Sequence, residues 1–318
     1  MLEQELLDVF TSAVAPPLAI AAAGYVLGRW REIDVEPLST VTVYLLMPAL
    51  VFHSLVTMPV GGDTAFALVT AMVGFTAVMA VTTAAVGRLA GETGSVLSGA
   101  TLAAAFPNVG NFGIPVATFA FGDIGRTTAV VFVLVQNVLL YTVGVYLLSS
   151  SGAGGDRTAA VERVLTLPVT YAVLAAGVAL AFDPVPAGGP SLETIGMVGD
   201  ASIPLFLIIL GIQLADMNPG RTIKRVVPTV GVKLLIAPIV AVVIALLIGI
   251  GDLEAGRAFV VLAAGPAAVT PLVLTIEFTD DQGEELSAAD YVGSVVLFTI
   301  FGCLPIVTGL ILTFDLFL

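Results

Sequence analysis

Apolar stretches of about 20 residues alternate with short polar connections along the whole chain. A hydrocarbon core of roughly 30 Å needs about 20 apolar residues in a helix that crosses it. The pattern therefore predicts an all-α membrane protein with ten transmembrane helices and no soluble domain. The predicted spans cover about residues 9–29, 37–57, 64–87, 96–121, 127–149, 162–182, 193–214, 226–249, 256–278 and 288–314.

The fourth apolar stretch contains residues that a stable membrane helix avoids. Between residues 105 and 122 it holds Pro107, Pro115, two asparagines and several glycines. Pro107 has no N–H and its ring clashes with the carbonyl of Ala103, so the helix is expected to break there. Broken backbone survives in a membrane only where protein or a wet cavity surrounds it, and transporters use such helices to hold solutes. The alternative is a proline kink repaired by neighbouring helices.

The spacing of the prolines indicates an internal repeat. Pro48 corresponds to Pro204, 156 residues later, and Pro107 corresponds to Pro266, 159 residues later. Five spans per unit is an odd number, so the second unit enters the membrane from the opposite side. We predict two inverted five-helix repeats with broken, crossing helices 4 and 9 and a binding site where they meet. The predicted repeats cover residues 1–149 and 161–318, joined by a short cytoplasmic linker at 150–160.

Composition and charge exclude several classes of protein. A mean hydropathy of +1.08 with 58% hydrophobic and 11% charged residues excludes a soluble globular domain. The net charge of −13, with acids gathered in loops, is typical of an archaeal, halophilic protein, and a cation-attracting mouth is the alternative. The sequence has no ATP-binding P-loop, catalytic triad or cysteine cluster, so neither an enzyme activity nor a cofactor is expected.

The distribution of lysine and arginine predicts the orientation. With the N-terminus outside, one set of loops carries most of these residues, and the positive-inside rule places that set in the cytoplasm. Both termini then lie outside the plasma membrane, which agrees with an even number of spans. The acidic N-terminus lacks the basic region of a signal peptide, so the first span is expected to remain. The cytoplasmic set comprises Arg29, Arg31, Arg88, Arg157, Arg163, Arg221, Lys224 and Arg225, and the outer set Arg126 and Arg257.

Three motifs lie in the second, fourth and fifth spans. They are Pro48-Ala-Leu-Val-Phe-His53, Pro107-Asn108-Val-Gly-Asn111-Phe-Gly113-Ile-Pro115 and Gln136-Asn137-Val-Leu-Leu-Tyr141-Thr142. The chain thereby resembles the auxin efflux carrier family of PIN-type carriers and bacterial and archaeal dicarboxylate carriers. The resemblance implies a bile-acid-symporter-like fold, with a scaffold domain from spans 1, 2, 6 and 7 and a transport domain from spans 3–5 and 8–10. The long cytoplasmic loop of PIN-type carriers is missing, and the ninth span lacks the polar residues that many members carry after Pro266.

The crossing of the broken helices is the expected site for an anion. Asn108 and Asn111 lie three residues apart, on one face of the half-helix that begins at Pro107. Their amides could donate hydrogen bonds to an anionic oxygen, and the half-helix N-terminus adds a partial positive charge. The alternative is that both asparagines only cap the broken helix. The expected substrate-binding residues are Pro107, Asn108, Asn111, Gln136, Lys233, Pro266, Val269 and Thr270.

Two of these polar positions allow more than one role. Because Gln136 and Asn137 are adjacent, one is expected to face the site and the other a helix interface, and the resemblance favours Gln136 for the site. Lys233 lies at membrane depth, where a cation is a functional candidate. It could neutralise a carboxylate substrate, bond broken-helix carbonyls or snorkel toward the membrane surface.

Ion coupling has several candidates. His53, the only histidine, could relay protons, although a packing role is the commoner case. Asp200 and Glu277 are acids inside predicted spans that could bind H⁺ or Na⁺. The backbone carbonyls of Ala103 and Leu262 each precede a proline by four residues, so they could coordinate Na⁺ unless neighbours satisfy them.

These features predict a secondary active transporter that moves a small organic anion, a carboxylate, by alternating access at the helix crossing. A Na⁺-coupled bile-acid-type symporter is the alternative mechanism. A channel or a non-transporting receptor on the same fold is the alternative class. The expected partners are the lipid bilayer, the organic anion, H⁺ or Na⁺ and, in a homodimer, a second copy of the chain. Nucleic acid is not an expected partner.

Overall fold

A computed structural model describes residues 15–31, 33–57, 61–144, 146–148, 168–182, 189–216, 223–278 and 287–317. Within these ranges every regular element is helical, and one isolated bridge joins two extended segments. The predicted linker at 150–160 and the acidic N-terminus lie outside the described residues.

The first half of the chain forms six α-helices and three π-helical turns in its described part. The side chain of Asp34 accepts the N–H of Glu36 and caps the second of these helices. The helices are α2 (Ala15–Trp30), α3 (Val35–Val41), α4 (Met47–Val56), α5 (Gly62–Leu89), α6 (Gly94–Ala105) and α7 (Ile114–Leu139). The π-helical turns are η2 (Thr42–Leu46), η3 (Val109–Gly113) and η4 (Leu140–Gly144).

The second half forms eight α-helices and one π-helical turn in its described part. Asp252 caps one of its half-helices by accepting the N–H of Ala255 at 2.9 Å. The helices are α10 (Pro168–Phe182), α11 (Pro190–Asp200), α12 (Ser202–Asp216), α13 (Ile223–Gly231), α14 (Ala237–Ile248), α15 (Leu253–Ala263), α16 (Thr270–Phe278) and α17 (Ala288–Phe317). The π-helical turn η5 (Val232–Ile236) joins α13 to α14.

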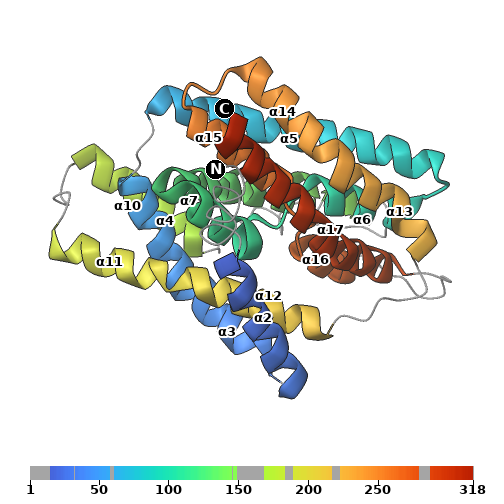
Figure 1. Cartoon of the computed structure of the whole chain (residues 1–318), viewed down its shortest axis with the longest axis horizontal. Helices are drawn as coiled ribbons and strands as arrows, with labels where there is room; N and C mark the ends of the chain where they lie inside the picture. The colour runs from blue at the N-terminus through green and yellow to red at the C-terminus, as the bar shows by residue number, and fades with distance from the viewer. Residues whose placement is uncertain are drawn as a thin grey trace.

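The helices pack in two groups. In one group α2 lies along α12, and both α10 and α11 pack on α4. Backbone meets backbone there, because a side chain at Gly24 or Gly211 would overlap the opposite helix. In the other group α5, α6, α7 and α13 to α17 pack on one another. Figure 1 shows α5 and α14 side by side along one edge of the molecule, with α2, α3 and α12 together at the opposite edge.

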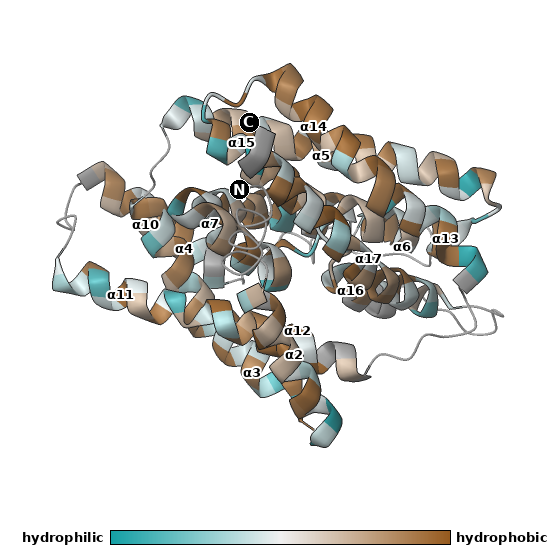
Figure 2. Ribbon diagram, viewed as in Figure 1, coloured by the Kyte–Doolittle hydropathy of each residue, from teal (hydrophilic) through white to brown (hydrophobic). Residues whose placement is uncertain are grey.

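Several helices match the dimensions of a membrane. Within the described residues, six helical stretches are long and apolar enough to cross one. They are Val35–Val56, Gly62–Leu89, Val109–Leu148, Pro190–Ile212, Lys224–Ile248 and Ala288–Phe314, and shorter apolar helices cover Leu18–Trp30, Gly94–Ala105 and Thr170–Ala181. Figure 2 shows hydrophobic residues along almost the whole of α14. The fold is therefore that of an all-helical membrane protein.

The longest apolar stretch folds back on itself. Val109–Leu148 contains 40 residues, about twice what one crossing needs. Gly122 interrupts this stretch with φ +58° and ψ −139°, a backbone conformation that residues with a Cβ rarely adopt. Three residues later, a Cβ at Gly125 would overlap the backbone carbonyl of Ala117. The chain thus reverses where the sequence predicts the connection between the fourth and fifth spans.

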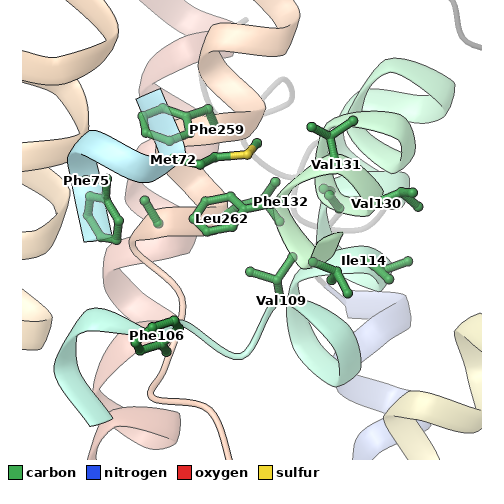
Figure 3. Close-up of a cluster of buried hydrophobic side chains, with 14 of the residues drawn as sticks. Met72, Phe75, Phe106, Val109, Ile114, Val130, Val131, Phe132, Phe259 and Leu262 are labelled. Atoms are coloured by element: carbon green, nitrogen blue, oxygen red, sulfur yellow. The ribbon is translucent and has the colours of Figure 1, made fainter. Parts of the chain in front are cut away.

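Aromatic packing supports the centre of the second group. Phe75 of α5, Phe132 of α7 and Phe259 of α15 form a cluster of three rings with centroids 5.9–6.4 Å apart. Such pairs contribute about 0.5–1.5 kcal/mol each beyond the burial of their area. Figure 3 shows this cluster beside the extended segment from Phe106 to Val109. The cluster holds the half-helix α15 against α5 and the part of α7 that follows Gly122.

Candidate functional site

Two broken helices meet at the centre of the molecule. The first breaks between α6 and η3, and the second between α15 and α16. The extended segments run antiparallel, with Pro107 opposite Ala267. Asn108 N–H donates to the Pro266 carbonyl at 2.8 Å, and Ala268 N–H donates to the Phe106 carbonyl at 3.0 Å. Each break therefore supplies partners for backbone groups that the other leaves without a helical partner.

A side chain from the helix that follows each broken helix also forms a hydrogen bond with the backbone of the crossing. Gln136 Nε2 of α7 donates to the Pro107 carbonyl at 2.9 Å. In the second half, Thr299 Oγ1 of α17 accepts the N–H of Ala267 at 3.0 Å. The two polar positions are 163 residues apart, close to the 159 that separate Pro107 from Pro266. The crossing is therefore bonded by one polar side chain from each half of the chain.

A cavity of about 180 Å³ lies beside the crossing, at the boundary between the two helix groups. The first group contributes apolar residues of η2, α4, α10 and α12, and the second contributes the polar ones. The cavity brings together five predicted site residues, Asn108, Asn111, Gln136, Val269 and Thr270. The other lining residues are Val43, Met47, Val109, Gly110, Val133, Asn137, Pro168, Phe206 and Ala268.

The amide groups at this cavity leave hydrogen-bonding capacity unused. Asn108 Oδ1 accepts the N–H of Asn111 at 3.3 Å, which leaves Nδ2 as the free end of the amide. Nδ2 is buried and has no hydrogen-bond partner among the described residues, and the same holds for Gln136 Oε1. A buried polar group without a partner costs about 1–3 kcal/mol. Both unpartnered atoms belong to residues that line the cavity, so they are candidates to bond a ligand there.

The electrostatics of the cavity favour negative charge. Both half-helices that leave the crossing begin at the cavity wall, one at η3 and the other at Thr270. A helix N-terminus carries roughly half a positive charge and free N–H groups. No Asp or Glu is among the lining residues. Asn108 thus caps the half-helix through its Oδ1, as one of the two interpretations of the sequence predicted, and it also lies in the cavity wall.

The structure does not bring every predicted residue to the cavity. Lys233 does not line the cavity; it is fully buried, and its Nζ donates to the Ala263 carbonyl at 3.2 Å. The prolines Pro107 and Pro266 are buried within the crossing and do not line the cavity. Asn137 does line it, although the sequence predicted that only one of the pair Gln136 and Asn137 would do so.

Two of the expected ion-coupling residues, His53 and Asp200, do not line the cavity. His53 is half-buried on α4, so close to Gly196 of α11 that a Cβ there would meet its Nε2 at 2.8 Å. The Leu262 carbonyl accepts the N–H of Gly265 at 3.1 Å, whereas Pro107 has no N–H to offer the carbonyl of Ala103. The side chain of Glu277 lies outside the described residues.

An ion pair that sequence reasoning missed links the two helix groups. Arg126 Nη1 of α7 lies 2.8 Å from Asp200 Oδ1 of α11, and its Nη2 lies 2.9 Å from Asp123 Oδ1. The Arg126 side chain is only 10% exposed. A second pair, Arg225 with Glu92, lies within the second group. The pattern identified these residues as charges, but it carried no signal about which residues they would pair with.

Comparisons with known proteins agree with this architecture. A family model described as membrane transport protein matches residues 9–166 and 158–311. The chain belongs to this family. The resemblance to auxin efflux carriers is thereby confirmed. The chain is also similar to an "uncharacterized transporter" of Methanothermobacter thermautotrophicus, with 28% identity over 271 residues, or 84% of this chain and 88% of the relative.

Membership of the membrane transport protein family establishes a multi-pass membrane transporter. It agrees with the broken helices, because irregular backbone at membrane depth is typical of transporters. Membership of the family does not specify the transported solute. The class of solute must therefore be inferred from the cavity.

Proposed function

We propose that this protein is a secondary carrier of a small organic anion, a carboxylate, which binds in the cavity beside the helix crossing. One observation carries the proposal. Two half-helices begin at the cavity wall, and the wall includes Asn108, whose buried Nδ2 has no hydrogen-bond partner among the described residues. An anionic oxygen satisfies that donor, whereas a cation would face the positive ends of both half-helices.

The volume of the cavity supports a small substrate. At about 180 Å³ it is smaller than the roughly 300–1,000 Å³ of sites for drug-sized ligands. Its apolar wall, which includes Met47 and Phe206, suits a short hydrocarbon chain attached to the carboxylate. Gln136 Oε1 offers an acceptor for a hydroxyl or a protonated carboxyl on the same molecule.

We further propose alternating access between the two helix groups. The group of α2, α3, α4, α10, α11 and α12 would act as the scaffold, and the other group would carry the crossing and its anion. The position of the cavity at their boundary supports this division. The antiparallel crossing supports two inverted five-helix repeats with ten spans. Both termini would then lie outside the plasma membrane.

Uptake by the purified protein in proteoliposomes tests the proposal. Labelled small mono- and dicarboxylates would be compared with neutral and cationic analogues of the same size. A carrier gives saturable uptake that unlabelled substrate on the opposite side stimulates. Unitary currents would instead indicate a channel, and binding without flux would indicate a receptor. Saturable uptake of the cationic analogue in preference to the anion would refute the assignment of substrate charge.

A further inference from the structure

An apolar groove of about 360 Å³ lies between the two helix groups, apart from the cavity beside the crossing. Residues of α2 and α12 line one side of this groove, and residues of η3, α7 and α17 line the other. The groove and the cavity share no lining residue among those that the structure describes. The groove is therefore a second hollow at the boundary between the two groups.

The groove has a buried floor and an exposed rim. Leu207, Phe112 and Val116 form the floor and are only 2%, 6% and 7% exposed. Tyr25 of α2 and Phe301 of α17 form the rim and are 42% and 57% exposed. A molecule that lies on the outer surface can touch the rim, whereas only a molecule that enters the groove reaches the floor.

The lining of the groove favours a hydrocarbon. The described lining residues include no Asp, Glu, Lys, Arg or His, and only Tyr25 and Thr308 have a polar atom in the side chain. A carboxylate or a lipid headgroup would lose its hydration there without gaining a charged partner. Water is also a poor occupant, because a buried water needs about two to four polar partners. An empty groove would leave its lining without dispersion contacts on one side.

The groove is continuous with the surface that faces the lipid. Its α2 residues lie within the apolar helix Leu18–Trp30, and its α17 residues lie within Ala288–Phe314, which is long and apolar enough to cross a membrane. The hydrocarbon that surrounds a protein at this depth consists of the acyl chains of the bilayer. The volume of the groove lies near the lower end of the roughly 300–1,000 Å³ of ligand sites, which suits a single chain.

Each side of the groove is fixed to its own helix group. A Cβ at Gly211 of α12 would overlap the backbone of α2, and a Cβ at Gly302 of α17 would overlap Leu234 of η5. The groove must therefore change shape when the two groups move relative to each other. Phe112 in its floor belongs to η3, the same turn that places Asn111 in the wall of the anion cavity. A chain in the groove thus lies against a turn that forms part of that cavity.

We propose that the groove binds one acyl chain of a phospholipid from the surrounding bilayer, and that the bound chain stabilises the described arrangement of the two helix groups. The effect on transport rests on the proposed function, because it requires the groups to move during the cycle, whereas the binding site itself does not. A side chain that fills the groove permanently should keep the affinity for the substrate and slow the change of access.

Photolabelling tests the site without any measurement of transport. The protein is reconstituted with phosphatidylcholine that carries a diazirine midway along one acyl chain, and mass spectrometry locates the label after irradiation. In the wild type the label should reach the floor, at Phe112 or Val116, and also Leu246, which is 77% exposed on α14. Ala22→Phe fills the groove from α2 and should lower floor labelling by about fivefold or more, while Leu246 labelling stays unchanged.

Ala23→Phe is the matched control, because Ala23 is the next residue of α2, is also exposed and does not line the groove. Its floor labelling should stay within about twofold of the wild type. Thr308→Phe fills the groove from α17 and repeats the test if Ala22→Phe does not fold. In uptake assays a filled groove should lower kcat by about threefold or more and leave KM within about twofold.

Several results would overturn the inference. They are an unlabelled floor in wild-type protein whose Leu246 is labelled, and floor labelling that persists in a folded variant with a filled groove. A dimer that Ala22→Phe converts into a monomer in gel filtration would assign the groove to a second copy of the chain and would also overturn it. Wild-type kcat in a variant that has lost the floor label would overturn the effect on transport. Absence of wild-type uptake would count against the proposed function alone, because the labelling would still decide the site.

Discussion

Asn108 can be tested for two roles at different atoms of one amide, the observed cap and the proposed bond to the anion. Its Oδ1 accepts the N–H of Asn111 and caps the half-helix, whereas its buried Nδ2 is free for a ligand. Asn108→Ala removes both. Loss of the cap costs about 1 kcal/mol of stability. Loss of a hydrogen bond to a charged ligand costs roughly 1.5–3 kcal/mol, which weakens binding about tenfold to a hundredfold.

Asn108→Ser separates the two roles. Serine caps helices about as well as asparagine, so its hydroxyl can still accept the N–H of Asn111. The serine side chain is shorter and has no amide N–H to reach the position of Nδ2. Stability should therefore return close to that of the wild type, while anion binding stays about tenfold to a hundredfold weaker. A residue that only caps the helix would recover both properties together.

Thermal unfolding of the detergent-solubilised protein gives the stability of each variant, and its shift with added carboxylate gives the relative affinity. Uptake in proteoliposomes supplies KM and kcat for the same variants. Wild-type affinity in Asn108→Ser would refute the donor role of Nδ2. Wild-type affinity in both variants would place the anion site elsewhere in the molecule.

Three further predictions concern the surroundings of the cavity. A Cβ at Gly110 would meet no atom within 4 Å, so Gly110→Val should fold, occupy part of the cavity and lower kcat/KM for uptake at least tenfold. Gly177→Val, at an equally open position on α10, should match the wild type. Pro107→Ala should let the fourth helix continue through the crossing, and uptake by the folded variant should fall at least tenfold. Normal uptake would mean that Pro107 only kinks the helix. Asp200→Asn breaks the Arg126 ion pair between the helix groups, where Asp200 is 55% exposed. Such an ion pair contributes about 0.5–1 kcal/mol, so its loss should shift the equilibrium between the two access states about twofold to fivefold. Labelling of a cysteine in the cavity wall measures the shift, which should shrink in high salt.

Interactions within single helices made much of the fold predictable from the sequence. Apolar length marks a membrane span, and proline marks a break wherever it occurs, because both effects act within one helix. The positions of Pro107 and Pro266 therefore located the crossing. The fold-back at Gly122 was also predictable as a connection, since a charged pair, Asp123 and Arg126, follows it. No comparable rule identifies the π-helical turns η2, η4 and η5, whose extra residue depends on packing against neighbours.

The partners within the site could not be derived in the same way. The N–H of Asn108 finds the carbonyl of Pro266 only because two segments about 160 residues apart lie antiparallel. Nothing in the sequence indicated Thr299 as a site residue, because a threonine hydroxyl in an apolar helix commonly donates to a backbone carbonyl of the preceding turn. It does so here, to Val295, while it also accepts the N–H of Ala267. Lys233 was recognised as important, but whether it faced a substrate or a carbonyl depended on packing.

The charge of the proposed substrate has a consequence for the direction of transport. When no ion crosses together with the substrate, the net charge moved per cycle equals the charge of the substrate alone. An elementary charge gains about 2.3 kcal/mol per 100 mV, which corresponds to about a fiftyfold concentration ratio for a monovalent anion. An interior-negative membrane potential therefore drives the anion outward, and the proposed carrier would act as an exporter unless another anion returns in exchange. An inside-positive potential set across proteoliposomes should accordingly accelerate uptake, whereas an inside-negative one should slow it. Uptake that does not respond to the potential would mean that a compensating charge crosses with the substrate, and it would refute the movement of the anion alone.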